Sequence, residues 1–140
     1  MKKRELVTKI MTDNPVTITL QDSLIDAQKI MEDRKIRHLP VVDNKEIIGM
    51  VSYTDLMRVN FVDNYSKGNE NVTTTLYSVL SIEQVMVENL VTVSTETTIR
   101  EAAEILSEKE FHALPVVDHN GLAGILTTTD LIKYLLEQYN

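Results

Sequence analysis

The chain has 140 residues, of which 43% are hydrophobic and 25% charged, a composition typical of a soluble globular protein of one domain or two small units. The absence of cysteine excludes disulfides, thiolate metal sites and cysteine nucleophiles. The net charge of −7 disfavours nucleic-acid binding. No apolar run approaches the roughly 18 to 20 residues of a membrane span, and the first residues lack the apolar stretch of a signal peptide. We therefore expect a cytoplasmic protein with no nucleic-acid partner and no membrane partner.

The first half of the chain predicts a β-α-β-β-α unit behind a lead-in helix at 6–11. A β-branched run at 16–18 indicates a short strand, and Ser23 with Asp26 forms a weak capping box that begins a helix. Apolar residues then recur at helical spacing and predict its buried face: Leu24, Ala27, Ile30 and Met31. Strands follow at 39–42, opened by Pro40, and at 47–51, and a last helix starts near Ser52.

The same elements return after a polar linker at 63–75. Residues 76–86 look helical and parallel the lead-in at 6–11. A strand at 91–93, a capping box formed by Thr98 and Glu101, and a final helix near Thr127 repeat the first half. We predict one repeat over 1–62 and a second over 76–140.

An ungapped alignment of 11–56 with 86–131 establishes this repeat. Met11 falls on Met86, 75 residues later, and the five-residue block at 39–43 recurs at 114–118. A unit of about 45 residues is marginal alone, so two copies can stabilise one another by burying their sheet faces.

The junction between the last strand and helix of each copy carries the candidate chemistry. Each junction has a glycine, two hydroxyl residues and an aspartate: Gly49, Ser52, Thr54 and Asp55 in the first copy, and Gly124, Thr127, Thr129 and Asp130 in the second. Hydroxyls and free N–H groups there suit a phosphate, and a carboxylate can accept both hydroxyl protons of a ribose. Helix capping also explains the first hydroxyl and the aspartate, and the two interpretations are compatible.

Arg37 and His112 occupy the same repeat position, three residues before the proline. Both can be cationic, His112 only when protonated. A surface charge explains Arg37 alone and a partly buried polar residue explains His112 alone, but their equivalence supports a phosphate contact. The replacement of Arg37 by His112 predicts that the two sites differ in charge and in pH response.

Metal binding and hydrolysis receive little support. His38, His112 and His119 share no ligand spacing, and no cysteine helps. A triad of Ser52, His38 and Asp55 lacks a nucleophile elbow, and Ala113 stands where the second copy would need its histidine. We predict no metal and no enzymatic activity.

The duplicated unit resembles the CBS (cystathionine beta-synthase) domain, and the pair resembles a Bateman module. The resemblance rests on 36–43 with 49–55 and on 111–118 with 124–130, and it extends over about 6–136. It implies an α+β fold of tandem β-α-β-β-α repeats, packed as a pseudo-two-fold pair around facing sheets with ligand clefts between them.

The resemblance also implies a binding site for an adenosine nucleotide. Asp55 and Asp130 would hold ribose hydroxyls, Ser52, Thr54, Thr127 and Thr129 would bind phosphate or ribose, and Arg37 and His112 would face the phosphates. Thr17 and Thr92 would lie beside the adenine, in a slot lined by the backbone of His38, Leu39 and Pro40 and of Ala113, Leu114 and Pro115.

The function implied is that of a non-catalytic sensor that binds AMP, ADP or ATP, requires no cofactor and signals to an effector protein. Such modules often pair into a disc of four CBS units, so we expect a homodimer. The alternative is a ligand-independent dimerisation scaffold, because every proposed site residue also has a capping or packing explanation.

Overall fold

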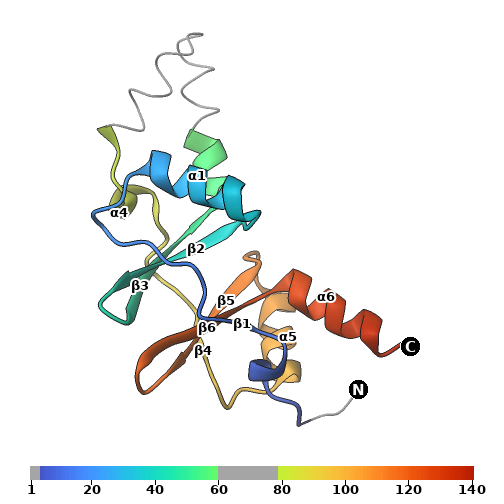
Figure 1. Ribbon diagram of the computed structural model, residues 1–140. Coiled ribbons are helices and arrows are strands. Elements are labelled where there is room, and N and C mark those ends of the chain that lie inside the picture. The colour runs from blue at the N-terminus through green and yellow to red at the C-terminus, as the bar shows by residue number, and fades with distance from the viewer. Residues whose placement is uncertain (1–3, 60–78) are drawn as a thin grey trace. The chain divides into compact units, whose positions relative to one another are not determined.

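The structure, a computed structural model, describes residues 4–59 and 79–140 (Figure 1). Two compact units divide the chain: one is formed by Val16–Leu90, the other by Met1–Pro15 with Val91–Asn140. Helices and strands in two sheets confirm the predicted α+β class. The linker at 63–75 lies outside the described residues, and the repeat boundaries 1–62 and 76–140 remain a prediction.

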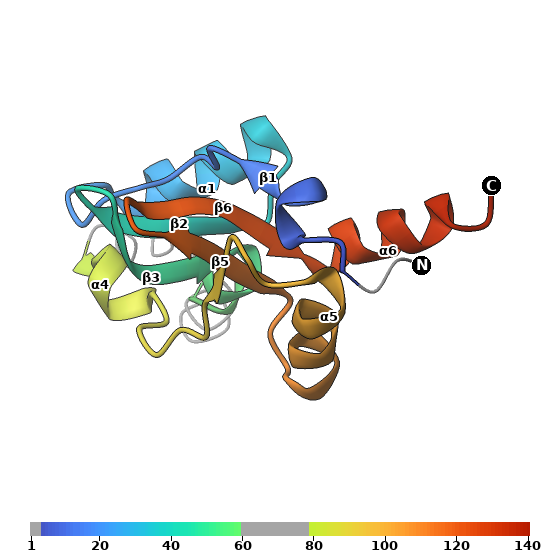
Figure 2. The same cartoon turned by 90° about the horizontal axis from the view of Figure 1, so that it is seen from below.

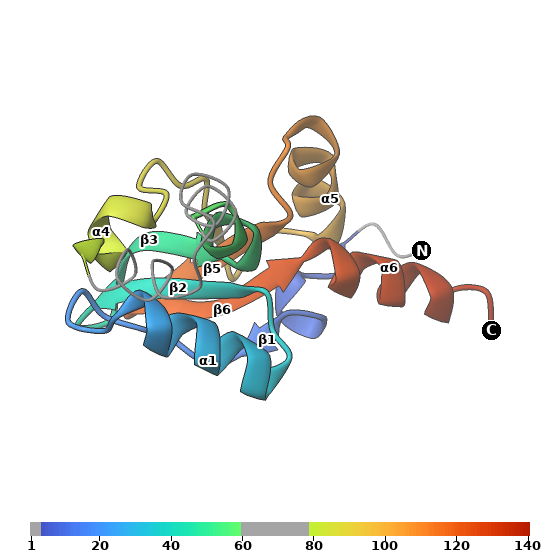
Figure 3. The same ribbon diagram turned by 90° about the horizontal axis from the view of Figure 1, so that it is seen from above.

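The unit Val16–Leu90 is built on an antiparallel pair of strands. Its elements are α1 (Leu24–Arg34), β2 (His38–Asp43), β3 (Glu46–Ser52), a helical stretch at 53–59 and α4 (Ile82–Val85). Figures 1 and 3 show α1 alongside β2 and α4 beside β3. The predicted capping box begins α1, because Ser23 Oγ accepts from the Asp26 N–H at 3.0 Å and Asp26 Oδ2 accepts from the Ser23 N–H at 3.2 Å.

The other unit repeats this plan with a larger sheet. Its elements are η1 (Val7–Lys9), β1 (Thr12–Asp13), β4 (Val93–Ser94), α5 (Ile99–Glu108), β5 (Ala113–Asp118), β6 (Gly121–Thr127) and α6 (Thr128–Glu137). The sheet order is β1-β6-β5-β4, with β4 parallel to β5 and the other pairs antiparallel. Figure 2 shows β6 leading directly into α6, which places the second junction between those elements. The capping box predicted for Thr98 and Glu101 is also confirmed.

The strand predicted at 16–18 is reduced to one bridge. Ile18 donates to the Pro40 carbonyl at 3.0 Å and accepts from the Val42 N–H at 2.9 Å, but the pairing stops there. In a parallel ladder the next donor would be the N–H of residue 40, which proline lacks. Pro115 has the same place in β5, and accordingly β4 begins at Val93 rather than at residue 91. The two prolines, placed inside β2 and β5 rather than at their openings, limit the first strand of each copy.

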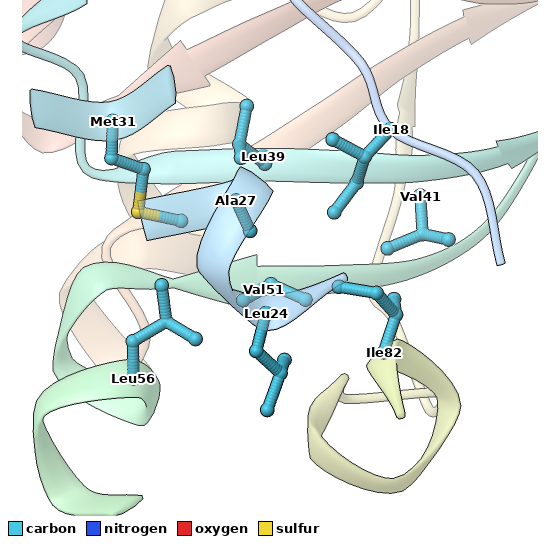
Figure 4. Packing of buried hydrophobic residues seen from close by; sticks show 9 residues of the cluster. All are labelled: Ile18, Leu24, Ala27, Met31, Leu39, Val41, Val51, Leu56 and Ile82. Atoms are coloured by element: carbon cyan, nitrogen blue, oxygen red, sulfur yellow. The ribbon is translucent and has the colours of Figure 1, made fainter. Parts of the chain in front are cut away.

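A core of aliphatic side chains fills each unit. Figure 4 shows the first core, formed by residues from both strands, from the helices packed on them and from the bridging segment at 18: Ile18, Leu24, Ala27, Met31, Leu39, Val41, Val51, Leu56 and Ile82. The second core contains Val7, Val93, Ala102, Leu106, Leu114, Val116 and Leu126. Three of the four residues of the stripe predicted for the first helix are buried, and Ile30 is half-buried. The equivalent stripe of the second copy behaves alike, with Ile99, Ala102 and Leu106 buried and Ile105 half-buried.

The lead-in segments contain less helix than the sequence predicts. The stretch 6–11 forms only the 3-10 turn η1, because Leu6 is extended and bridges Thr98 while Val7 donates to the Thr97 carbonyl at 2.9 Å. Within 79–86 the helix is interrupted, because Val79 is helical, residues 80 and 81 are not, and α4 spans Ile82–Val85. Residues 76–78 lie outside the described residues.

The residues that directly follow each lead-in pair with the other copy of the repeat. Thr12 of β1 is the register partner of Ile125 in β6, and Val87 exchanges two backbone hydrogen bonds of 2.9 and 3.0 Å with Met50 in β3. The unit that contains β6 is therefore assembled from two stretches of chain that are distant in sequence, whereas the other unit is one continuous stretch.

Candidate functional site

The first junction lies where β2 begins and β3 ends. His38 and Ser52 are register partners there, and a helical turn follows immediately. Asp55 donates its N–H to Ser52 Oγ at 3.0 Å, and Asp55 Oδ2 accepts from the Ser52 N–H at 3.2 Å. The remaining oxygen, Oδ1, lies 3.6 Å from a guanidinium nitrogen of Arg58. The carboxylate thus uses one oxygen for the cap and turns the other toward a cation.

The second junction has the same geometry at the start of α6. Thr127 is the register partner of Ala113. Asp130 donates its N–H to Thr127 Oγ1 at 3.2 Å, and Asp130 Oδ2 accepts from the Thr127 N–H at 2.9 Å. The capping explanation of both aspartates is therefore correct, and in each case it occupies only one carboxylate oxygen.

Backbone hydrogen bonds hold Arg37 and His112 next to these junctions. The Tyr53 N–H donates to the Arg37 carbonyl at 2.7 Å, and the Thr128 N–H donates to the His112 carbonyl at 3.0 Å. The guanidinium carbon of Arg37 also lies 5.1 Å from the centre of the Tyr53 ring, within the range of a cation–π interaction. Their equivalence, inferred from sequence, therefore extends to the backbone. Among residues 4–59 and 79–140, the aromatic partner of a junction cation is found at the first junction.

The other predicted site residues divide into exposed hydroxyls and buried wall residues. Four threonines are exposed: Thr17, Thr54, Thr92 and Thr129. Five residues of the two strand starts are buried: Leu39, Pro40, Ala113, Leu114 and Pro115. His38, Ser52, Asp55, Thr127 and Asp130 are half-buried, and Arg37 and His112 are exposed. In each unit the strand pairing brings the wall residues and the capping pair to one end of the sheet, whereas the ligand contacts themselves remain a prediction.

The glycine of each junction has a packing role that sequence reasoning missed. A Cβ built on Gly49 would lie 2.3 Å from Met86 Sδ, and one built on Gly124 would lie 2.6 Å from Met11 Sδ. These methionines belong to the lead-in segments, so the missing side chain of each glycine leaves room for a lead-in to pack against the strand. The signal was in the alignment, because Met11 and Met86 occupy the same repeat position.

Tyr53 and Arg58 are the other residues that the sequence did not single out. Tyr53 stands between the two hydroxyl residues, and Arg58 follows Asp55 by three positions, a spacing that brings side chains together on a helix. Both could have been found by asking which neighbours of the repeated residues differ between the copies.

Within 4–59 and 79–140, no group of three or more histidine, aspartate or glutamate residues is arranged to hold a metal ion. Among the helices of those same residues, none combines the length and the apolar character needed to cross a membrane.

Comparison with known proteins identifies relatives of both sequence and fold. Residues 7–61 and 82–137 match the family described as CBS domain. Protein MJ1404 of Methanocaldococcus jannaschii is 32% identical over an alignment of 139 residues, which covers 94% of this chain and 32% of that protein. The chain spans a third or less of the length of the curated relatives that it matches first.

Two solved structures carry ligands in their descriptions. CBSX2 in complex with AMP has a TM-score of 0.78 and 27% identity, covering 97% of this chain and 99% of that one. The CBS domain pair of protein MJ0100, in complex with 5′-methylthioadenosine and S-adenosyl-L-methionine, has a TM-score of 0.72 and 25% identity, covering 93% of this chain and 98% of that one. The ligands in these two descriptions share an adenosine group.

Proposed function

We propose, because this chain belongs to the CBS domain family, that it is a non-catalytic regulatory module that binds an adenosine nucleotide at its two junctions. The observation that carries the proposal is the repeated hydroxyl–carboxylate pair, Ser52 with Asp55 and Thr127 with Asp130. In each pair Oδ2 is used by the cap. Oδ1, which in Asp55 also lies 3.6 Å from an Arg58 nitrogen, is the oxygen that accepts from a ribose hydroxyl. The adenosine ligands of CBSX2 and of the MJ0100 domain pair support a ligand that contains this ribose.

The proposed roles follow the position of each residue at the strand ends. Asp55 and Asp130 accept from ribose hydroxyls, and the neighbouring hydroxyls of Thr54 and Thr129 are exposed and can donate to ribose or phosphate oxygens. The adenine lies beside the exposed threonines Thr17 and Thr92, against the strand starts at 38–40 and 113–115. AMP, ADP and ATP are the ligands we favour, acting as regulatory ligands rather than as cofactors.

Assembly and signalling complete the proposal. We expect a cytoplasmic homodimer in which ligand binding changes the surface offered to an effector protein. A ligand shifts such an equilibrium only through its difference in affinity for the two states.

The first experiment is a thermal-shift and calorimetric titration of the full chain with AMP, ADP, ATP and S-adenosylmethionine. A ligand at 100 times its dissociation constant adds about 2.7 kcal/mol to the free energy of unfolding, which raises the Tm. Asp55→Asn and Asp130→Asn keep a cap acceptor but lose the charged oxygen, and together they should weaken binding at least about tenfold.

Matched controls come from the other capping boxes of the same repeats. Asp26→Asn and Glu101→Gln alter the same hydrogen-bond pattern at α1 and α5, so they should leave the affinity unchanged. Equal affinity in the Asp55/Asp130 double variant and the wild type would refute the site. No shift with any nucleotide would favour the ligand-independent scaffold instead.

A further inference from the structure

The two junctions differ at three equivalent positions, and each difference changes the groups that are available to bind a phosphate. Arg37, Tyr53 and Arg58 of the first junction correspond to His112, Thr128 and Lys133 of the second. The first junction therefore has two guanidinium groups and a tyrosine ring, whereas the second has an imidazole, an ammonium group and a threonine. Guanidinium groups bind phosphate through paired N–H groups of fixed geometry, which an ammonium group does not offer.

Tyr53 fixes the position of the Arg37 side chain in the first junction. The ring belongs to the residue whose N–H donates to the Arg37 carbonyl at 2.7 Å, so the backbone keeps the two side chains adjacent. The guanidinium carbon lies 5.1 Å from the ring centre, although Arg37 is otherwise exposed. An exposed arginine loses side-chain freedom when it binds a ligand, and a side chain that is already stacked loses less.

We infer that Tyr53 is a positioning residue that holds Arg37 for the phosphate of the ligand and makes the first junction the phosphate-selective one. This inference rests on the proposed nucleotide function and deepens it. The first junction then discriminates strongly between AMP and adenosine. The second junction, with no stacked cation, discriminates less.

The test measures this discrimination directly. Calorimetric titrations of the full chain with AMP and with adenosine are made in the Asp130→Asn background, which weakens the second junction so that binding at the first junction dominates. Tyr53→Leu removes the aromatic ring and retains side-chain bulk, and it should weaken AMP binding roughly two- to fivefold while adenosine binding stays unchanged. Tyr53→Phe retains the ring and should preserve both affinities.

A coupling measurement separates positioning from a structural role. In an Arg37→Gln background, Tyr53→Leu should have no further effect on AMP, because the ring then has no cation to hold. Thermal unfolding of each variant verifies that it folds. If Tyr53→Leu does not fold, the test uses Tyr53→Phe instead. A ratio of AMP to adenosine affinity that differs between Tyr53→Phe and the wild type would contradict the inference.

The possible failures are distinguishable. If neither AMP nor adenosine binds to the wild type, the proposed function and this inference fall together. If AMP binds and Tyr53→Leu leaves the AMP-to-adenosine ratio unchanged, the inference alone is overturned. The reciprocal variant His112→Arg/Thr128→Tyr, made in the Asp55→Asn background, should gain AMP selectivity at the second junction. An unchanged ratio of AMP to adenosine affinity in this variant would also contradict the inference.

Discussion

Gly124 and Thr12 approach so closely that a Cβ on the glycine would lie 2.7 Å from the threonine carbonyl oxygen. The equivalent glycine, Gly49, is crowded by the side chain of Met86. A methionine side chain can rotate away, whereas the Thr12 carbonyl belongs to the β1–β6 pairing and cannot move without disturbing it.

Gly124→Ala should therefore destabilise the protein more than Gly49→Ala does. We expect a loss of about 1–3 kcal/mol in the free energy of unfolding for Gly124→Ala, measured by urea denaturation, and less than about 1 kcal/mol for Gly49→Ala. Adding Met86→Ala should relieve the overlap at Gly49, while adding Met11→Ala should leave the Gly124→Ala variant strained. Equal losses for the two glycine variants would contradict this prediction.

The capping box of α5 makes Glu101 a stronger acid. The backbone N–H of Thr98 donates to Glu101 Oε1 at 3.0 Å, and the Thr98 hydroxyl donates to the same oxygen at 2.9 Å. Both bonds lower the pKa of the Glu101 carboxyl below its ordinary 4.5, the backbone bond more than the hydroxyl bond. Because the folded-state pKa is lowered, the stabilisation is fully present above pH 4.5 and is lost as the pH falls through the folded-state value.

Thr98→Ala should accordingly raise the pKa of Glu101 toward 4.5, and a carbon-detected NMR titration of the side chain measures it. The backbone donor remains, so the return should be partial. Ser23→Ala at the equivalent cap of α1 is the control and should leave Glu101 unchanged. A Glu101 titration that is identical in the wild type and Thr98→Ala would show that the hydroxyl contributes nothing.

Tyr134 fastens the N-terminal segment to α6. Its hydroxyl donates to Glu5 Oε2, and the backbone carbonyl of Glu5 accepts from the Ile99 N–H at 2.8 Å. Tyr134→Phe should reduce the free energy of unfolding by about 0.5–1.5 kcal/mol, because the carboxylate loses a donor in a half-buried place.

Hydrogen exchange gives the local readout for this variant. The Val7 N–H, bonded to the Thr97 carbonyl, should exchange faster in Tyr134→Phe than in the wild type. Lys9→Ala removes only the exposed ion pair with Glu5 and should change the exchange little. Unaltered protection of Val7 in Tyr134→Phe would mean that the tyrosine does not hold the segment.

Truncation of a core side chain should reduce the free energy of unfolding by a similar amount at equivalent positions of the two repeats. Leu39 and Leu114 are both fully buried, at the same place in β2 and β5. Each leucine-to-alanine substitution should cost about 2–5 kcal/mol in urea denaturation, whereas Leu20→Ala, at a residue 38% exposed, should cost far less. Similar values for Leu20→Ala and Leu114→Ala would contradict the full burial of Leu114.

Local patterns predicted the parts of the fold that depend on neighbours in sequence. The alignment of the two copies predicted the repeat, and the resemblance of both copies to the CBS domain predicted the family. The capping pairs located the starts of α1 and α5 within one residue. The strand at 16–18 was overestimated, because its β-branched residues favour a strand while the missing N–H of Pro40 acts from a distant position.

The candidate site was predicted in its repeated residues but not in its contacts. Asp55 and Asp130 were found because both copies have them, and Tyr53 was not, because its significance lies in a stack with Arg37 across the end of the sheet. The pairing of Met11 with Gly124 likewise depends on chain distant in sequence, which no local pattern encodes.

The pairing of Thr12 with Ile125 also sets an order for synthesis on the ribosome. Residues 16–90 include both strands of one unit and its lead-in, so that unit can close while translation continues. The other unit cannot, since its first strand leaves the exit tunnel more than a hundred residues before the partner strand β6. Until β6 is synthesised, residues 4–15 have no sheet to pair with, and a nascent chain stalled near residue 110 should bind chaperones that recognise hydrophobic segments through residues 4–15.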